Sequence, residues 1–185
     1  MSAPGGRDGA MPAITLHQPW ASWIAGGLKT IETRTHTQFS GLAGRRIAIH
    51  AGKRFDRRAV GLLASAIGPG NLTPEFRTGL RWGRSQGAYP AGAIVCTAEV
   101  AEARWLAPGD SAAALCPCDE TLFGLVLAEV RTLIPVLPWR GGRGIWYVPL
   151  VSLVEACHAA WDVPCFCGRH HFAAGDALPC KGILR

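Results

Sequence analysis

The sequence predicts one α/β domain of the α+β type, a small, curved and partly closed mixed sheet of five to six strands with flanking helices. Its 185 residues suit one domain, or one domain with an extension, and can bury a sizeable core. Hydrophobic residues make up 49% of the chain, which argues against disorder. Short alternating apolar segments, separated by turns that contain Gly or Pro, are typical of the strands of such a sheet.

The first part of the chain predicts a strand, a helix, a tight turn and a second strand. Residues 13–17 alternate enough for a short strand, and Pro19 suits the first position of a helix. Gly26 and Gly27 should end this helix, because glycine tolerates the left-handed conformation found at helix ends. Residues 30–34 then alternate as a strand does.

The rest of the chain predicts further strands at 46–51, 93–100, 122–130 and 144–148, and helices at 56–67 and 150–161. Asp56 can cap the first of these two helices. Residues 68–92, rich in Gly, Pro and Arg, predict a long loop, and such loops are usually functional or mobile. Trp82 and Tyr89 in this loop are candidates for stacking on bases, with a disordered loop as the alternative.

The charge distribution indicates a polyanionic partner. The net charge is +6, and arginine, which suits phosphate oxygens, supplies most of the positive charge. Residues 41–60 carry six cations and one acid, whereas residues 99–130 carry six acids and one arginine. One basic and one acidic flank predict RNA or DNA bound in one orientation. A protein partner on the acidic flank is an alternative.

The termini and the cysteines point to a cytoplasmic protein without a cofactor. Residues 1–11 lack the apolar core of a signal peptide and are interpreted as a disordered leader, and no apolar run approaches the ~20 residues of a membrane span. The odd number of cysteines, seven, favours free thiols or a metal site over disulfides. Residues 150–185 predict a helix followed by a Cys/His-rich extension. The cysteines of this extension are spaced as Cys-x-Cys, which is closer than zinc sites usually require, so bound zinc is only the alternative. The weak candidate zinc ligands are Cys165, Cys167, His170 and Cys180.

The most informative cluster is Lys29, Glu32 and Arg34. The glycine turn should deliver Lys29 to the mouth of the sheet, and strand alternation puts Glu32 and Arg34 on one face. Such a cluster can bind a phosphate or act on an acyl or phosphoryl centre, and the alternative is a surface ladder of ion pairs. Of Trp20 and Trp23, one is expected in the core and the other is free to stack on a base.

These residues belong to a longer pattern, Gln-Pro-Trp-Ala-Ser followed by Gly-x-Lys-x-x-Glu-x-Arg. Its positions are Gln18, Pro19, Trp20, Ala21, Ser22, Gly27, Lys29, Glu32 and Arg34. The pattern resembles the signature of the ASCH family (activating signal cointegrator homology), a branch of the PUA-like fold, and weaker matches extend the resemblance over residues 12–149. The resemblance implies a PUA-like pseudo-barrel with a cleft beside the first helix and nucleic-acid binding as the commonest role.

The resemblance also leaves an enzymatic alternative open. Some relatives hydrolyse an acetylated cytidine, and some have been described as ribonucleases. The hydrolases carry Thr three residues after the Lys, where this chain has Glu32, so we favour binding. In an enzyme, Lys29 would be the nucleophile or base and Glu32 would relay the proton.

The resemblance and the basic stretch together predict a basic cleft for RNA, or for single-stranded or modified nucleic acid. His50 ends a predicted strand near the cleft and is either a structural side chain or an acid–base group. A lone histidine is more often the former. The predicted contacts are Gln18, Trp20, Ser22, Lys29, Glu32, Arg34, Arg45, Arg46, His50, Lys53, Arg54, Arg57 and Arg58.

Overall fold

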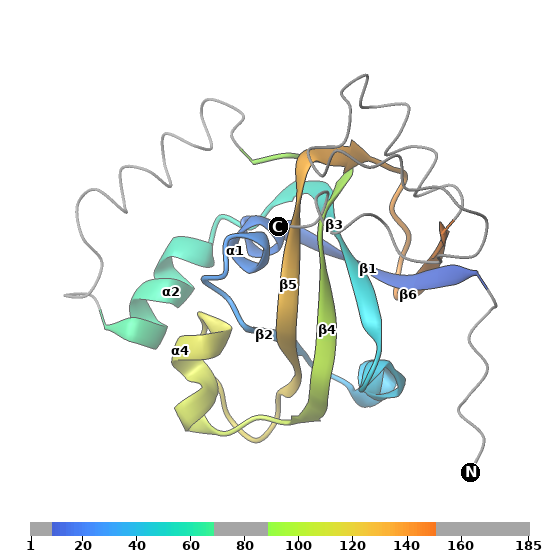
Figure 1. Ribbon diagram of the computed structural model, residues 1–185. Helices are drawn as coiled ribbons and strands as arrows, with labels where there is room; N and C mark the ends of the chain where they lie inside the picture. The colour runs from blue at the N-terminus through green and yellow to red at the C-terminus, as the bar shows by residue number, and fades with distance from the viewer. Residues whose placement is uncertain (1–8, 69–88, 151–185) are drawn as a thin grey trace, which may run out of the picture.

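The computed structural model describes residues 9–68 and 89–150, which form one mixed six-stranded sheet with short helices (Figure 1). The predicted α+β class and strand number are therefore confirmed. The sheet order is β2-β5-β4-β3-β1-β6; β1 and β3 pair in parallel and the other neighbours pair antiparallel. The strands are β1 (Ala10–Gln18), β2 (Ile31–Arg34), β3 (Arg46–Phe55), β4 (Ala93–Trp105), β5 (Phe123–Pro138) and β6 (Ile145–Pro149).

The helices of the described residues are short and lie mainly on one side of the sheet. Figure 1 shows α1, α2 and α4 gathered beside β2 and β5, while β6 lies at the opposite edge. The helices of the described residues are α1 (Trp20–Ala25), α2 (Ala59–Ile67), α4 (Ser111–Ala114) and the 3₁₀ helices η1 (Thr37–Leu42) and η3 (Pro108–Asp110). This side of the molecule also holds the cleft described below.

Irregular pairing curves the sheet. The register between β4 and β5 shifts at three places, and that between β3 and β4 shifts at Ile49/His50. Each extra residue in one strand bends it and increases its twist. Glu129, in the irregular part of β5, has a φ of +46°, a conformation that non-glycine residues adopt mainly at such sites. The two longest strands therefore bend instead of running flat.

The core lies between the curved sheet and α1. Alternating residues of β1, β3, β4 and β5 point to the same side, where α1 adds Ala21 and Ile24. All of these side chains are removed from water, which is the main stabilising contribution to the fold. The principal sheet residues of this cluster are Ile14, Ile47, Ile49, Val95, Val100 and Leu125.

Several boundaries differ from the sequence prediction. Ala10 and Met11, assigned to the leader, belong to β1 because they pair with β6. The strands β3, β4 and β5 extend beyond the predicted ranges, since sheet pairing continues after the apolar alternation ends. Asp56 does not cap α2, because this helix begins after Arg58. The Asp56 carboxylate instead accepts a hydrogen bond from the Arg58 backbone N–H at 3.0 Å.

Some predictions concern residues outside the described ranges. These are the leader up to residue 8, most of the long loop with Trp82, and the predicted helix and Cys/His-rich extension from residue 151 onward. Tyr89 is described and packs against Phe55, with ring centroids 5.3 Å apart, beside the cluster that contains Trp23. Within the described ranges, no helix combines the length and the apolar character that crossing a membrane requires.

Candidate functional site

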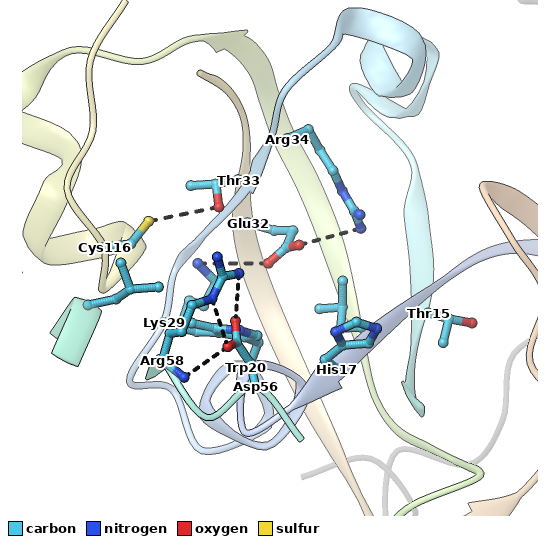
Figure 2. Close-up of a pocket in the computed structure, with 12 residues that line it drawn as sticks. Thr15, His17, Trp20, Lys29, Glu32, Thr33, Arg34, Asp56, Arg58 and Cys116 are labelled. Atoms are coloured by element: carbon cyan, nitrogen blue, oxygen red, sulfur yellow. Dashed lines mark hydrogen bonds and ion pairs between the residues drawn. The ribbon is translucent and has the colours of Figure 1, made fainter. Parts of the chain in front are cut away.

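A cleft of about 280 Å³ opens between the end of β1, α1, β2 and the turn before α2 (Figure 2). Its lining includes three cationic side chains and two carboxylates. The charged residues are Lys29, Arg34, Arg58, Glu32 and Asp56. The cluster predicted from the sequence therefore meets in one solvent-reachable cavity and does not spread over an open surface.

The glycine turn after α1 sets the position of Lys29. Gly27 adopts a φ of +74°, and the N–H groups of Leu28 and Lys29 both donate to the carbonyl oxygen of Trp23, at 2.8 and 3.1 Å. A side chain at this φ would be strained, so glycine is the residue that allows the chain to reverse here. The turn then directs the Lys29 side chain inward.

Lys29 is buried, with only 2% of its surface exposed. Its Nζ donates to the carbonyl oxygen of Ala114 at 2.5 Å, lies 3.7 Å from Oε2 of Glu32, and sits 5.2 Å from the centre of the Trp20 ring. A buried ammonium group requires such partners, because an unpaired one would lose its hydration without replacement. The surface-ladder alternative is therefore inconsistent with the position of Lys29.

Glu32 and Arg34 project from the same face of β2, as strand alternation predicts. Oε1 of Glu32 lies 3.4 Å from Nη2 of Arg34, and the Arg34 guanidinium stacks over Phe39 at 4.4 Å from the ring centre. However, Nε and Nη2 of Arg34 are buried and make no hydrogen bond within the described structure. Buried donors without a hydrogen bond are rare in native proteins, so these two nitrogen atoms are the most distinctive feature of the cleft.

The opposite wall is formed by Trp20, Asp56 and Arg58. The Asp56 carboxylate accepts hydrogen bonds from Trp20 Nε1 at 3.3 Å and from Arg58 Nε at 3.2 Å. Burial tends to raise the pKa of Asp56, but these hydrogen bonds outweigh it, and the pKa lies below its ordinary value. Trp20 also contacts Trp23 edge to face, and Trp23 is the one of the two in the core.

Thr33 and Cys116, which the sequence does not predict as residues of the site, line the other end of the cleft. Figure 2 shows the Thr33 hydroxyl pointing toward the Cys116 thiol, and the two atoms are 3.9 Å apart. Cys116 follows α4 and is 83 positions from Thr33 in the chain. No local sequence pattern predicts a contact between residues so far apart in the chain.

Gln18 and Ser22, predicted as nucleic-acid contacts, do not line the cleft. Gln18 is buried; its Oε1 accepts a hydrogen bond from the Ser22 backbone N–H, and its Nε2 donates to the carbonyl oxygen of Pro90 at 2.6 Å. These two bonds fasten the start of α1 to the segment before β4. Gln18 therefore orients the helix that carries Trp20.

The structure divides the basic stretch among different places. Arg46 lies at the start of β3, opposite Glu99, and donates to the Glu129 carbonyl oxygen at 3.0 Å. Arg58 borders the cleft, and Lys53 borders a second cavity. The remaining residues of the stretch line neither cavity: Arg45, Arg54 and Arg57.

His50 lines the second cavity, of about 700 Å³, and is absent from the lining of the cleft. It is 3% exposed, and its Nε2 lies 3.0 Å from the carbonyl oxygen of Trp139, so this nitrogen carries the proton and donates. Burial lowers the pKa of His50 below its ordinary value, against the opposing effect of this hydrogen bond. His50 is therefore neutral near pH 7.

Within residues 9–68 and 89–150, no three or more His, Cys, Asp or Glu side chains are grouped to hold a metal ion. The Cys/His-rich extension lies outside these ranges, so the prediction that the protein carries no zinc stays a prediction.

Comparison with known proteins identifies the family. No curated protein sequence matches the chain significantly. The family model for the ASCH domain matches residues 14–135, which include the second half of β1, the strands β2 to β4, most of β5 and every charged residue of the cleft. This match and the curved mixed sheet agree with a PUA-like fold and suggest a nucleic-acid-related role. The chain therefore belongs to the ASCH domain family.

Proposed function

We propose that the protein binds RNA, or single-stranded or modified nucleic acid, by holding one base in the cleft. The observation that supports this most directly is the Arg34 guanidinium, which lines the cleft and has two nitrogen atoms, Nε and Nη2, without a hydrogen bond. A buried donor without a partner costs about 1–3 kcal/mol. The Arg34 side chain is 20% exposed, and a ligand toward which the guanidinium turned these donors would recover that free energy on binding.

The polar groups of the cleft match the edge of a base. Arg34 can donate to a carbonyl oxygen or a ring nitrogen, and Glu32, beside it, can accept from an exocyclic amino group. Recognition of an unpaired base by hydrogen bonds to its edge is the usual mode in single-stranded RNA. The cleft volume of about 280 Å³ lies just below the usual range for pockets that hold drug-sized ligands, which suits one base.

In this proposal Trp20 supports Lys29 instead of serving as the stacking platform that the sequence predicts. One face of its ring is covered by the Nζ of Lys29, and its indole N–H is bonded to Asp56. Trp20 then holds Lys29, and Lys29 in turn neutralises Glu32. Base specificity would come from Arg34 and Glu32.

A hydrolase acting on a modified nucleoside remains a second candidate because of Thr33. The hydrolase-type pattern has Thr at the place of Glu32, yet the cleft of this chain contains the Thr33 hydroxyl one position later. Against catalysis, Nζ of Lys29 is already engaged by Ala114 and Glu32 and is poorly placed to attack a substrate.

The test is the affinity of a fluorescently labelled, mixed-sequence 12-nucleotide RNA, measured by anisotropy and compared with the same sequence as DNA. Arg34→Ala should weaken binding at least tenfold. Its free energy of unfolding should change by less than about 1 kcal/mol, because removing unsatisfied donors offsets the lost contacts with Glu32 and Phe39. Arg131→Ala removes the same charge from a residue that lines neither cavity and is the matched control.

Equal affinities of wild type and Arg34→Ala would refute the proposal. Incubation with N4-acetylcytidine, followed by chromatography, distinguishes the second candidate. Binding without turnover by the wild type supports the proposal, and efficient deacetylation supports the hydrolase. Glu32→Thr restores the hydroxyl of the hydrolase pattern and should gain weak deacetylation if Glu32 is what blocks that reaction.

A further inference from the structure

We infer that the second cavity is a phosphate subsite, which holds the backbone of a nucleic-acid strand whose base occupies the cleft. This inference rests on the proposed function and narrows it, because the ligand would then be a strand and not a free nucleoside.

The charges of the second cavity are of one sign. Lys53, Arg140 and Arg143 line it, and none of its lining residues is acidic. All three side chains are exposed, and no ion pair is recorded for them among residues 9–68 and 89–150. The cleft, in contrast, offsets two of its three positive charges with Glu32 and Asp56. A ligand that is neutral at one end and anionic at the other fits this pair of cavities.

The two arginines are held by a loop that is fixed to the sheet. They flank Gly141 and Gly142, in the connection between β5 and β6. A Cβ at Gly141 would collide with the His50 ring and lie 2.8 Å from the Thr15 hydroxyl, and one at Gly142 would lie 2.9 Å from the Trp146 ring. The loop backbone therefore packs directly onto β1, β3 and β6, which only glycine allows. The order Arg-Gly-Gly-Arg places one guanidinium group at each end of this packed segment.

The base of the second cavity has its own hydrogen-bonded framework. His50 Nε2 donates to Trp139, the first residue of the loop, and Trp146 Nε1 donates to the Thr15 hydroxyl at 3.1 Å. The rings of His50 and Trp146 meet edge to face, 5.7 Å apart. These contacts fix the loop before any ligand binds, and a preformed site loses less conformational entropy on binding.

The two cavities adjoin along β1. Thr15 lines both of them, and it pairs directly with His50 in the parallel ladder between β1 and β3. Figure 2 shows Thr15 at the margin of the cleft, beyond His17 as seen from Glu32. A strand that places a base near Arg34 can therefore continue past His17 and Thr15 and reach the arginines of the loop.

The salt dependence of RNA binding tests this subsite. Each phosphate contact on a single strand contributes about −0.7 to the slope of log K against log salt. Arg140→Ala and Arg143→Ala should each reduce the steepness of the slope for the 12-nucleotide RNA by about 0.7. The double variant should reduce it by about 1.4 and weaken affinity at least tenfold at low salt. Arg131→Ala, the control, should leave the slope unchanged.

A second probe separates failure of the subsite from failure of the proposed function. Inorganic pyrophosphate, titrated into ¹⁵N-labelled protein, should shift the amide signals of Gly141 and Gly142 in the wild type but not in the double variant. These shifts without RNA binding would support an anion site for a free phosphate compound and would overturn both the strand inference and the proposed function. RNA binding that depends on Arg34, but with an unchanged slope in the double variant, would overturn the subsite alone.

Discussion

Replacing Lys29 with methionine should lower the free energy of unfolding by about 2–3 kcal/mol, although a lysine substitution usually has little effect. The structure gives the reason. Methionine keeps most of the length of the side chain but removes a charged donor that contacts the Ala114 carbonyl oxygen at 2.5 Å and Glu32 at 3.7 Å. A hydrogen bond from a charged group contributes about 1.5–3 kcal/mol. We take the upper part of this range because Lys29 is 2% exposed and the carbonyl loses its side-chain donor.

Urea unfolding followed by tryptophan fluorescence measures this loss. The midpoint should fall while the m-value stays unchanged, since the surface exposed on unfolding is the same. Lys53→Met is the matched control: Lys53 is exposed, and its replacement should change stability by less than about 0.5 kcal/mol. A Lys29→Met loss as small as that of the control would refute the buried placement of Lys29.

A double-mutant cycle locates the origin of the effect. If the ion pair carries part of the stability, Lys29→Met and Glu32→Gln should together cost less than the sum of their separate effects. The expected coupling is at least about 0.5 kcal/mol, as found for residues in one network. Strict additivity would assign the whole loss to the bond with Ala114.

Two further predictions concern a histidine and the metal content. The folded-state pKa of His50 is lowered, so the unfolded chain binds more protons once the pH falls below about 6.5, and stability should decrease from about pH 7 to pH 5. The melting temperature, plotted against pH, should therefore fall in the wild type over this range. His50→Gln, which can still donate to Trp139, should make this decrease smaller. An unchanged decrease in the variant would contradict the burial of His50. Elemental analysis of the purified protein should find no zinc, or substoichiometric zinc, because the cysteine spacing is poor. One zinc per chain, lost in a Cys165→Ser, Cys167→Ser variant, would overturn that prediction.

The part of the site that the sequence predicts is the part that local chemistry determines. A glycine turn with a positive φ and a strand of period two suffice to direct Lys29, Glu32 and Arg34 toward one region. The strand–helix–turn–strand order of the first third follows from the same short-range rules. Neither prediction depends on contacts with distant parts of the chain.

Burial of the site depended on contacts that no short-range rule supplies. Ala114, which receives the hydrogen bond of Lys29, is 85 positions away in the chain, and Cys116 comes from the same remote segment. A lysine is almost never fully buried unless paired, so the sequence favours exposure for Lys29. Likewise, His50 and the loop from Trp139 to Gly142 meet across 89 positions. The sequence therefore does not predict the second cavity, and it places His50 in the cleft, whereas His50 lines the second cavity.

In the proposed binding mode, Glu32 acts through the charges of the cleft. Glu32 is shared between two cations, with Nζ of Lys29 at 3.7 Å and Nη2 of Arg34 at 3.4 Å. Because Lys29 is fixed by Ala114 and Trp20, it neutralises Glu32 from one side, and Arg34 need not turn all its donors toward the carboxylate. Nε and Nη2 of Arg34 are both buried and make no hydrogen bond among the described residues, and Nη2 keeps only its ion pair with Glu32. Threonine at this position would leave Lys29 and Arg34 without a shared anion, whereas the glutamate keeps both cations in place, as the proposed recognition of a base requires.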